Sequence, residues 1–114
     1  MAIDAGKNII DAVILATSAT TIYTVTNNLL RAKIDSIAFT NYGSAIVKLT
    51  VHIVSSGGTA SSENMLIKER EIKPGKTYLA PELNGQGISE GGTIQAFSDI
   101  ATSVGCTATG TLYS

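Results

Sequence analysis

The stretch Ala-Ile-Val-Lys-Leu-Thr-Val-His-Ile-Val, residues 45–54, decides the fold class of this 114-residue chain. Within it, apolar side chains recur at every second position, at Val47, Leu49, Val51 and Ile53. The positions between them carry the polar residues Lys48, Thr50 and His52. A period of two over this length is typical of a half-buried antiparallel β-strand, because successive side chains of a strand point to opposite faces. We therefore expect a strand with one buried and one solvent-facing side.

The segment before this strand alternates in the same way, with Ile37 and Phe39 on one face. Asn41-Tyr42-Gly43-Ser44 is a turn sequence that separates the two segments. A short polar connection between two alternating segments favours a β-hairpin. The sequence therefore predicts that residues 34–40 and 45–54 are hydrogen-bonded neighbours.

Short strands separated by turn residues account for most of the remaining chain. Turns are expected at Asn27-Asn28 and at Lys73-Pro74-Gly75-Lys76, and residues 55–62 form an exposed polar loop. The expected strands cover residues 13–16, 21–25, 31–40, 45–54, 64–72, 77–80, 93–97 and 102–113. About seven or eight short strands with regular turn signals are typical of a β-sandwich or barrel. The expected fold class is all-β, a single antiparallel β-sandwich, with a jelly roll as the specific topology considered.

The first 12 residues allow two interpretations. Ile3, Ile9, Ile10 and Val13 lie loosely on one side of a helical turn, but so short a helix is marginal without packing partners. An extended N-terminal arm is the favoured interpretation. The expected domain organisation is an N-terminal arm over residues 1–12 and a β-sandwich domain over residues 13–114.

The composition argues against several classes of protein. The formal net charge is −1 and the sequence pI is about 5.7, so neutralisation of phosphates gives no basis for nucleic-acid binding. One cysteine cannot form an internal disulfide, and one cysteine with one histidine cannot provide a usual zinc site. The apolar runs are too short for a membrane span, and the first residues lack a secretory signal pattern. We expect no metal, no cofactor, no nucleic acid and no membrane among the binding partners.

Uncharged polar residues are the unusual part of the composition. Serine and threonine together occupy 25 positions, glycine occupies 11 more, and only 15% of the residues are charged. Threonine favours strands and glycine favours tight turns. Several threonines are expected on strand faces opposite the apolar residues, at Thr50, Thr107, Thr109 and Thr111. Such faces form polar surfaces suited to ordered contacts.

His52 and Cys106 are the only residues of their types. His52 projects from the polar side of its strand without a nucleophile or carboxylate partner nearby in the chain, so a surface or interface position is expected. Cys106 belongs to the apolar-facing set of the last strand, where a free cysteine packs as a small hydrophobic residue. The acidic residues are dispersed, without a spacing that indicates acid–base chemistry or a calcium loop. We expect no catalytic, cofactor-binding or metal-binding residues, and a protein that is not an enzyme.

Two further segments have a functional and a structural interpretation. The glycine-rich residues 85–92 are similar to a phosphate-binding loop, but Pro81 precedes them and a strand follows, so a loop leading into a hairpin is expected. Lys68-Glu69-Arg70-Glu71 and the nearby Lys73 form the densest charge run. Its alternating signs place lysine and arginine on one side of a strand and the glutamates on the other. This pattern is compatible with a charge-protected edge strand and with a polar contact surface for a protein partner.

Four stretches of the sequence are similar to a known type of protein. They are residues 21–25 (TIYTV), 32–41 (AKIDSIAFTN), 72–77 (IKPGKT) and 93–96 (TIQA). In this order they resemble small β-sandwich virion proteins of tailed bacteriophages, over roughly residues 20–112. The resemblance implies a β-sandwich on the virion, either cementing the capsid shell or belonging to the neck or tail. It implies no catalytic residues, and residues 1–20 have no counterpart in it.

The leading hypothesis is a phage capsid decoration (cement) protein on the capsid exterior, with the major capsid protein as its partner. Closed homo-oligomers, dimers or trimers, are the expected form. An extended arm can add a strand to a neighbour, and many copies on a symmetric shell give avidity. The alternatives are a neck, tail or fibre-associated virion protein and, from a different class, a carbohydrate-binding β-sandwich with Tyr42 or Tyr78 as its aromatic platform. Copy number per particle separates the first two.

Overall fold

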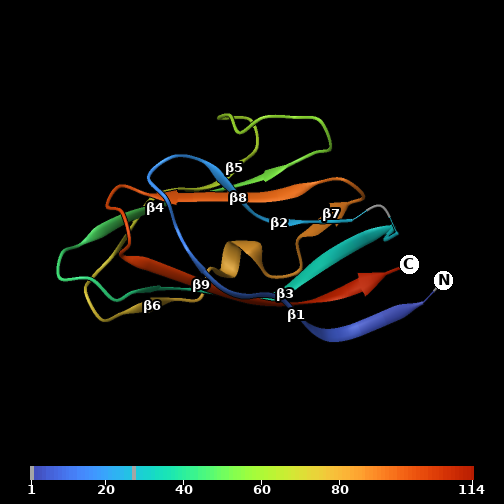
Figure 1. The fold of residues 1–114 in the computed structure, drawn as a ribbon, viewed down its shortest axis with the longest axis horizontal. Coiled ribbons are helices and arrows are strands. Elements are labelled where there is room, and N and C mark those ends of the chain that lie inside the picture. Colours follow the sequence, from blue (N-terminus) through green and yellow to red (C-terminus); the bar gives the residue numbers. More distant parts are fainter. Residues whose placement is uncertain (1, 27) are drawn as a thin grey trace.

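The structure, a computed structural model, describes residues 2–26 and 28–114. Two antiparallel β-sheets pack face to face in it, and 58% of the residues are in strands (Figure 1). Within the described residues the one helical element is a 3₁₀ turn at Pro81–Leu83. The expected all-β sandwich is therefore confirmed. The turn expected at Asn27-Asn28 lies partly outside the described residues.

Each sheet combines strands from distant parts of the chain. The five-stranded sheet has the order β1 (Ile3–Ile14), β9 (Val104–Tyr113), β3 (Arg31–Asn41) and β6 (Thr77–Tyr78), and β7 (Gly87–Ser89) also pairs with β3. The four-stranded sheet has the order β2 (Thr20–Thr24), β8 (Thr93–Ser98), β4 (Val47–Val54) and β5 (Met65–Ile72). In Figure 1 the two sheets lie one above the other, with the four-stranded sheet on top.

The core lies between the central strands of the two sheets. Its largest fully buried side chains include Phe39 of β3, Leu49 of β4 and Ile94 of β8. These are the positions at which the sequence alternates most clearly. Removing a side chain of this size from water contributes about 1.5–3 kcal/mol, so each of these residues adds to the packing of the two sheets.

The predicted hairpin between residues 34–40 and 45–54 is wrong. β3 pairs with β9, β6 and β7, whereas β4 pairs with β5 and β8 in the other sheet. The reason is the side chain of Asn41, which is fully buried at the crossing between the sheets. Its Nδ2 donates to the carbonyls of Ala45 and Ile72, each at 2.8 Å, and its Oδ1 accepts from the amide of Gly43 at 2.9 Å. These hydrogen bonds stabilise a connection that crosses from one sheet to the other, and a hairpin turn is not formed.

The N-terminal segment is an integral strand, which corrects both the expected arm and the boundary at residues 12 and 13. β1 pairs with β9 along its length, from Ile3 opposite Tyr113 to Ile14 opposite Gly105. Ile10 is buried in the core, which explains why the segment folds onto the domain. The helical alternative is wrong as well. Three irregularities interrupt the register of β1, and this irregular edge hinders the addition of a strand from another chain.

Candidate interaction surface

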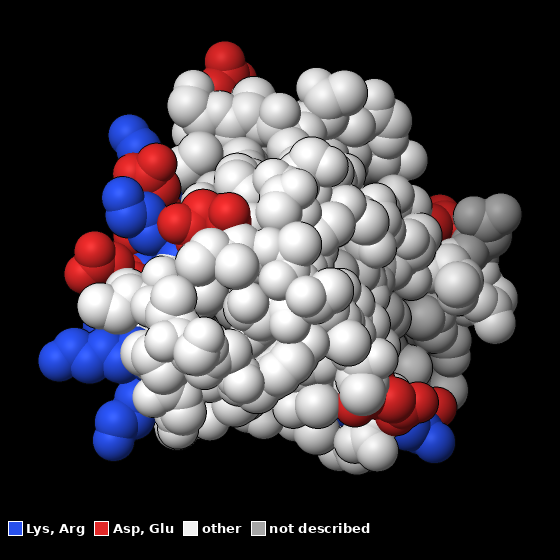
Figure 2. Space-filling model, turned by 60° about the vertical axis from the view of Figure 1, so that its left-hand side comes forward, with Lys and Arg blue, Asp and Glu red and all other residues white. Residues whose placement is uncertain are grey.

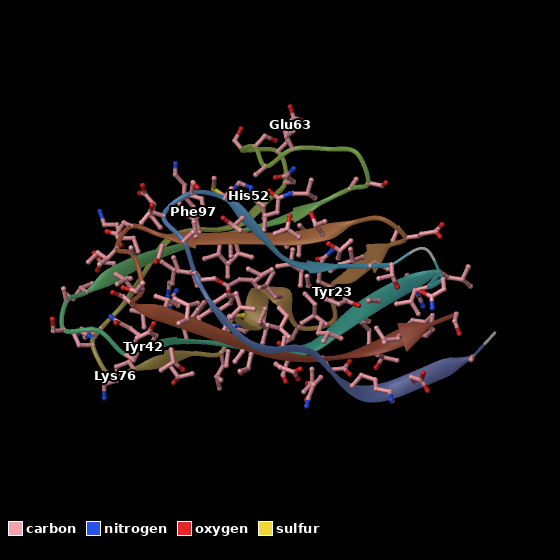
Figure 3. The ribbon with its side chains drawn as sticks, in the orientation of Figure 1. Tyr23, Tyr42, His52, Glu63, Lys76 and Phe97 are labelled. Carbon is pink, nitrogen blue, oxygen red and sulfur yellow. The ribbon has the colours of Figure 1, made fainter. Side chains whose placement is uncertain are left out.

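His52 is buried, contrary to the surface position expected from the sequence. Its side chain lies on the outer side of the four-stranded sheet, where its ring stacks on Phe97 with centroids 6.4 Å apart. The connection between β4 and β5 folds back over this site, and Figure 3 shows His52 and Phe97 side by side below the loop that carries Glu63. His52 Nδ1 donates to Asn64 Oδ1 at 2.8 Å, because an amide oxygen can only accept. The histidine therefore binds the β4–β5 connection to the outer side of the four-stranded sheet.

Cys106 packs in the core, as expected. It is a free cysteine with little exposed surface, and burial raises the pKa of its thiol to about 12. A thiol in this state is protonated at neutral pH and has no nucleophilic character. The placement is that of a residue that packs in the core.

The glycine-rich residues 85–92 contain β7 between two turns, where Gly85 and Gly91 adopt positive φ angles of 82° and 79°. β8 follows, and no helix begins there to present its N-terminus to a phosphate. The structural interpretation of this segment as a loop is therefore correct. The expected hairpin is not formed, because β7 pairs with β3 whereas β8 pairs with β2 and β4.

The charge run forms an edge strand, as the structural interpretation predicts. Residues 68–71 are exposed on β5, the last strand of the four-stranded sheet. The expected alternation of signs between two sides is broken at Glu69, whose φ of 49° marks a register shift against β4. The guanidinium of Arg70 lies 4.5 Å above the ring of Tyr78, on the other sheet.

Tyr78 is further engaged by Glu82, to which its hydroxyl donates a hydrogen bond. Burial, together with this hydrogen bond, raises the pKa of Tyr78 to about 12. The same hydrogen bond lowers the pKa of Glu82 below its ordinary value. Arg70, Tyr78 and Glu82 thus join the two sheets along one side of the sandwich, which accounts for part of the charge run structurally.

The described residues contain no group of three or more histidine, cysteine, aspartate or glutamate side chains able to hold a metal ion. In the same residues, no helix has the length and apolar character needed to cross a membrane. Since His52 and Cys106 are both buried, exposed surface features remain as the candidates for function.

A surface with exposed apolar side chains lies at one end of the sandwich, where the charged residues Lys48, Lys76 and Asp99 also occur. Four of the eight exposed large apolar side chains occur there, namely Ile14, Tyr42, Ile46 and Ile100. Ile14 is the last residue of β1, and the other three belong to the connections β3–β4 and β8–β9. We call this surface the apolar end. Figure 2, with this end turned forward, shows charged side chains at the margins of a broad and mostly uncharged surface. Figure 3 shows Tyr42 at the same end.

Backbone hydrogen bonds fix the segments that present these side chains. The amide of Tyr42 donates to the carbonyl of Ser103 at 2.9 Å. The amide of Leu15 donates to the carbonyl of Val104, also at 2.9 Å. Asp99 Oδ1 accepts from the amide of Lys48 at 2.7 Å. The backbone that carries the apolar side chains is therefore ordered before any partner binds, which lowers the entropy lost on binding.

Most of the apolar end could not be recognised in the sequence. Tyr42 was considered only as an aromatic platform for a sugar, and Ile14, Ile46 and Ile100 carry no motif. The one usable signal is that Ile46 and Ile100 stand next to turn residues, where a solvent-exposed connection has no need of large apolar side chains.

The arrangement of the tyrosines gives little support to a carbohydrate site. The ring of Tyr78 contacts Arg70 and its hydroxyl binds Glu82, which leaves Tyr42 as the exposed one of the two tyrosines. A polar hollow of about 650 Å³ does occur between the β4–β5 connection and β7, where Asn64, Gln86 and Glu90 are among its lining residues. No aromatic side chain lines this hollow.

No protein-family model matches this chain, and no curated protein was found to be similar to it.

Proposed function

We propose that the protein is a structural virion protein that binds and stabilises a phage capsid shell as a decoration (cement) protein. The apolar end is the observation that carries the proposal, because it offers a prearranged, largely uncharged contact surface on a domain whose histidine and cysteine are buried. The resemblance of residues 20–112 to virion proteins of tailed phages supports the same conclusion. The major capsid protein is the proposed partner, on the capsid exterior.

The strand order supports a jelly-roll interpretation of the sandwich. Leaving out the short β7, the sheets have the orders β1-β9-β3-β6 and β2-β8-β4-β5. Most strands that follow one another in the chain, such as β1 and β2 or β3 and β4, therefore lie in opposite sheets, and β4 and β5 are neighbours in one sheet. Two sheets of four strands joined in this way are typical of jelly rolls, an architecture that occurs in viral capsid and lectin domains.

The energetics of the apolar end suit a protein that binds in many copies. Full burial of one large apolar side chain contributes about 1.5–3 kcal/mol, and those at the apolar end are already partly covered. A contact of this size is modest after the cost of association is subtracted. A symmetric shell offers the same site many times, and oligomeric copies that bind adjacent sites gain affinity without new contacts.

Substitutions at the apolar end test the proposal. The double substitution Ile46→Ser and Ile100→Ser should lower occupancy on capsid shells by at least about tenfold in apparent affinity. Leu66→Ser is the matched control for Ile100→Ser, because Leu66 and Ile100 are 39% and 37% exposed and Leu66 lies on β5. Unchanged shell binding by a folded double variant would contradict the proposed surface.

A neck, tail or fibre position is the alternative within the same class of virion protein. Hundreds of copies per particle indicate a decoration protein, and a dozen or fewer indicate the neck or tail. The apolar end serves equally well as a contact surface in either place, so the copy number is the observation that separates the two.

A further inference from the structure

The outer face of the five-stranded sheet is uncovered and hollowed. Two adjoining hollows of about 390 and 350 Å³ lie on it, over β9 and its neighbours β1 and β3. Ala38 of β3 and Thr107 of β9 line both hollows, and these residues are direct partners in the β3–β9 ladder. Alanine, glycine and threonine occupy the middle of this surface. Because their side chains are small, the larger side chains around them project further from the sheet and leave the hollows between them. We call this surface the β9 face.

The hydroxyl groups of the β9 face are largely satisfied within the sheet. Ser36 Oγ and Thr109 Oγ1 are hydrogen-bonded at 2.8 Å, and Thr40 Oγ1 and Thr77 Oγ1 at 2.9 Å. A polar group costs free energy when it is buried only if it loses its hydrogen-bonding partner. Because these hydroxyls bond to each other across strands, the β9 face can be covered by another protein surface at little cost.

Apolar side chains project from the rim of the same face. Leu79 lines the larger hollow and, at 66% exposure, is the most exposed of the large apolar side chains. Ile14 lines the smaller hollow and is 60% exposed. The face therefore combines projecting apolar side chains with hollows lined by small residues, which is the combination that a self-complementary surface requires.

Charge also favours contact between two identical faces. Asp11 is the only charged residue among those that line the two hollows. Lys33 and Asp35, further along β3, form an ion pair with Nζ and Oδ1 3.8 Å apart. Two copies of this surface can therefore meet with little repulsion between like charges.

From these observations we infer that the β9 face is an isologous interface between two copies of this chain. The molecule extends 45 Å along its longest axis and 20 Å along its shortest. In Figure 1 the sheets are stacked along the remaining, vertical axis, so the β9 face spans the longest and the shortest axes. A face that spans these two directions is large enough for the ~800 Å² per partner that a standard protein interface buries. Ile14 belongs to both the apolar end and the β9 face, but Leu79, Ala38 and Thr107 lie outside the apolar end, so substitutions there test the interface separately from the proposed function.

Sedimentation equilibrium over a concentration series tests the interface. At about 100 µM, well above a micromolar dissociation constant, the wild-type chain should have twice its monomer mass of 11.8 kDa. Leu79→Glu and Thr107→Arg should each raise the dimer dissociation constant at least about tenfold, because each places like charges opposite one another. Leu30→Glu is the matched control, since Leu30 is 60% exposed and lies in the β2–β3 connection. It should leave the dimer intact.

Cysteine cross-linking gives a second readout that does not require disruption of the interface. Thr107→Cys should form a disulfide-linked dimer under mild oxidation. Thr59→Cys, in the exposed β4–β5 loop, is the control and should not form one. The native Cys106 is present in both variants and is buried. The inference is overturned by a monomeric wild-type chain, by an oligomer of another size, or by a dimer that persists in both β9-face variants. Equal cross-linking of both cysteine variants would overturn it as well.

Discussion

The outer faces of the two sheets begin from the same sequence pattern and end in different environments. On the four-stranded sheet, the outward residues Thr50 and His52 are buried, because the β4–β5 loop folds over this side of the sheet and Asn64 binds the histidine. On the five-stranded sheet, the outward residue Thr107 is exposed, and none of the residues that the structure describes covers the hollows beside it. One face is thus completed by the protein itself, and the other remains available for a partner.

Removing most of β1, an outer strand of the uncovered sheet, should have the largest effect on the stability of the domain. Deletion of residues 2–12 removes the buried Ile10 and exposes the long side of β9, so we expect the domain to lose cooperative folding. The loss of Ile10 alone is worth about 2–5 kcal/mol. Thermal melting followed by circular dichroism measures the effect. A truncated domain that melts like the full chain would show that residues 2–12 are a separable arm after all.

The crossing between the sheets should be the next most sensitive point. Asn41→Ala removes three hydrogen bonds and leaves buried backbone groups of Gly43, Ala45 and Ile72 without those partners. We expect a loss of about 2–4 kcal/mol in the free energy of unfolding, measured by urea denaturation. The exposed Asn84 offers a matched control, and Asn84→Ala should change stability by less than about 0.5 kcal/mol.

A direct comparison of the two outer faces comes from alanine substitutions. His52→Ala should cost about 1–3 kcal/mol and should make the β4–β5 loop more sensitive to proteases, because Asn64 and Phe97 lose their partner. Thr107→Ala on the β9 face should cost less than about 0.5 kcal/mol in the monomer. Equal losses in the two variants would mean that the faces do not differ in the way described.

The thiol of Cys106 provides a prediction on pH. Its pKa is about 12 in the folded protein and near the ordinary value of 9 once the chain unfolds. The folded state therefore keeps a proton that the unfolded state releases, so this contribution to stability is complete below pH 9 and declines as the pH rises from 9 toward 12. Urea denaturation at pH 8 and pH 10 measures the decline, and Cys106→Ala should reduce it.

The smallest effect is expected where Tyr78 and Glu82 join the sheets. The hydrogen bond from Tyr78 lowers the pKa of Glu82, so the contribution is present above the ordinary pKa and is lost as the pH falls through the lower folded value. Glu82 is exposed, and solvent screening keeps the effect small. Glu82→Gln should flatten the stability profile slightly below about pH 4.5, and an unchanged profile would argue against the contact.

The alternation of residues 45–54 and 31–40 was enough to predict the strands, their core-facing apolar side chains and the sandwich, but the expected solvent-facing side of residues 45–54 is wrong, because Thr50 and His52 are buried. It could not predict pairing partners. The single side chain of Asn41 directs β4 into the opposite sheet, and its hydrogen bonds reach residues 4 and 31 positions away. Nor could local pattern show that a loop would cover His52, since that depends on the distant Asn64.

The same limit applies to the candidate surfaces. Ile14, Ile46 and Ile100 are separated by tens of residues in the sequence and are brought to one end only by the strand order. The hollows of the β9 face depend on the pairing of Ala38 with Thr107, which neither segment reveals alone. Composition did indicate a threonine-rich outer surface, but Thr50 and Thr111 are buried while Thr107 is exposed.

Counting this protein in purified phage particles tests the proposed function most directly. Quantitative mass spectrometry against the major capsid protein gives the number of copies per particle, and electron cryomicroscopy of the same particles gives their position. The proposal predicts hundreds of copies on the outer surface of the shell, with the apolar end directed at the capsid. Absence from the particles, or a dozen or fewer copies confined to the neck or tail, would contradict it.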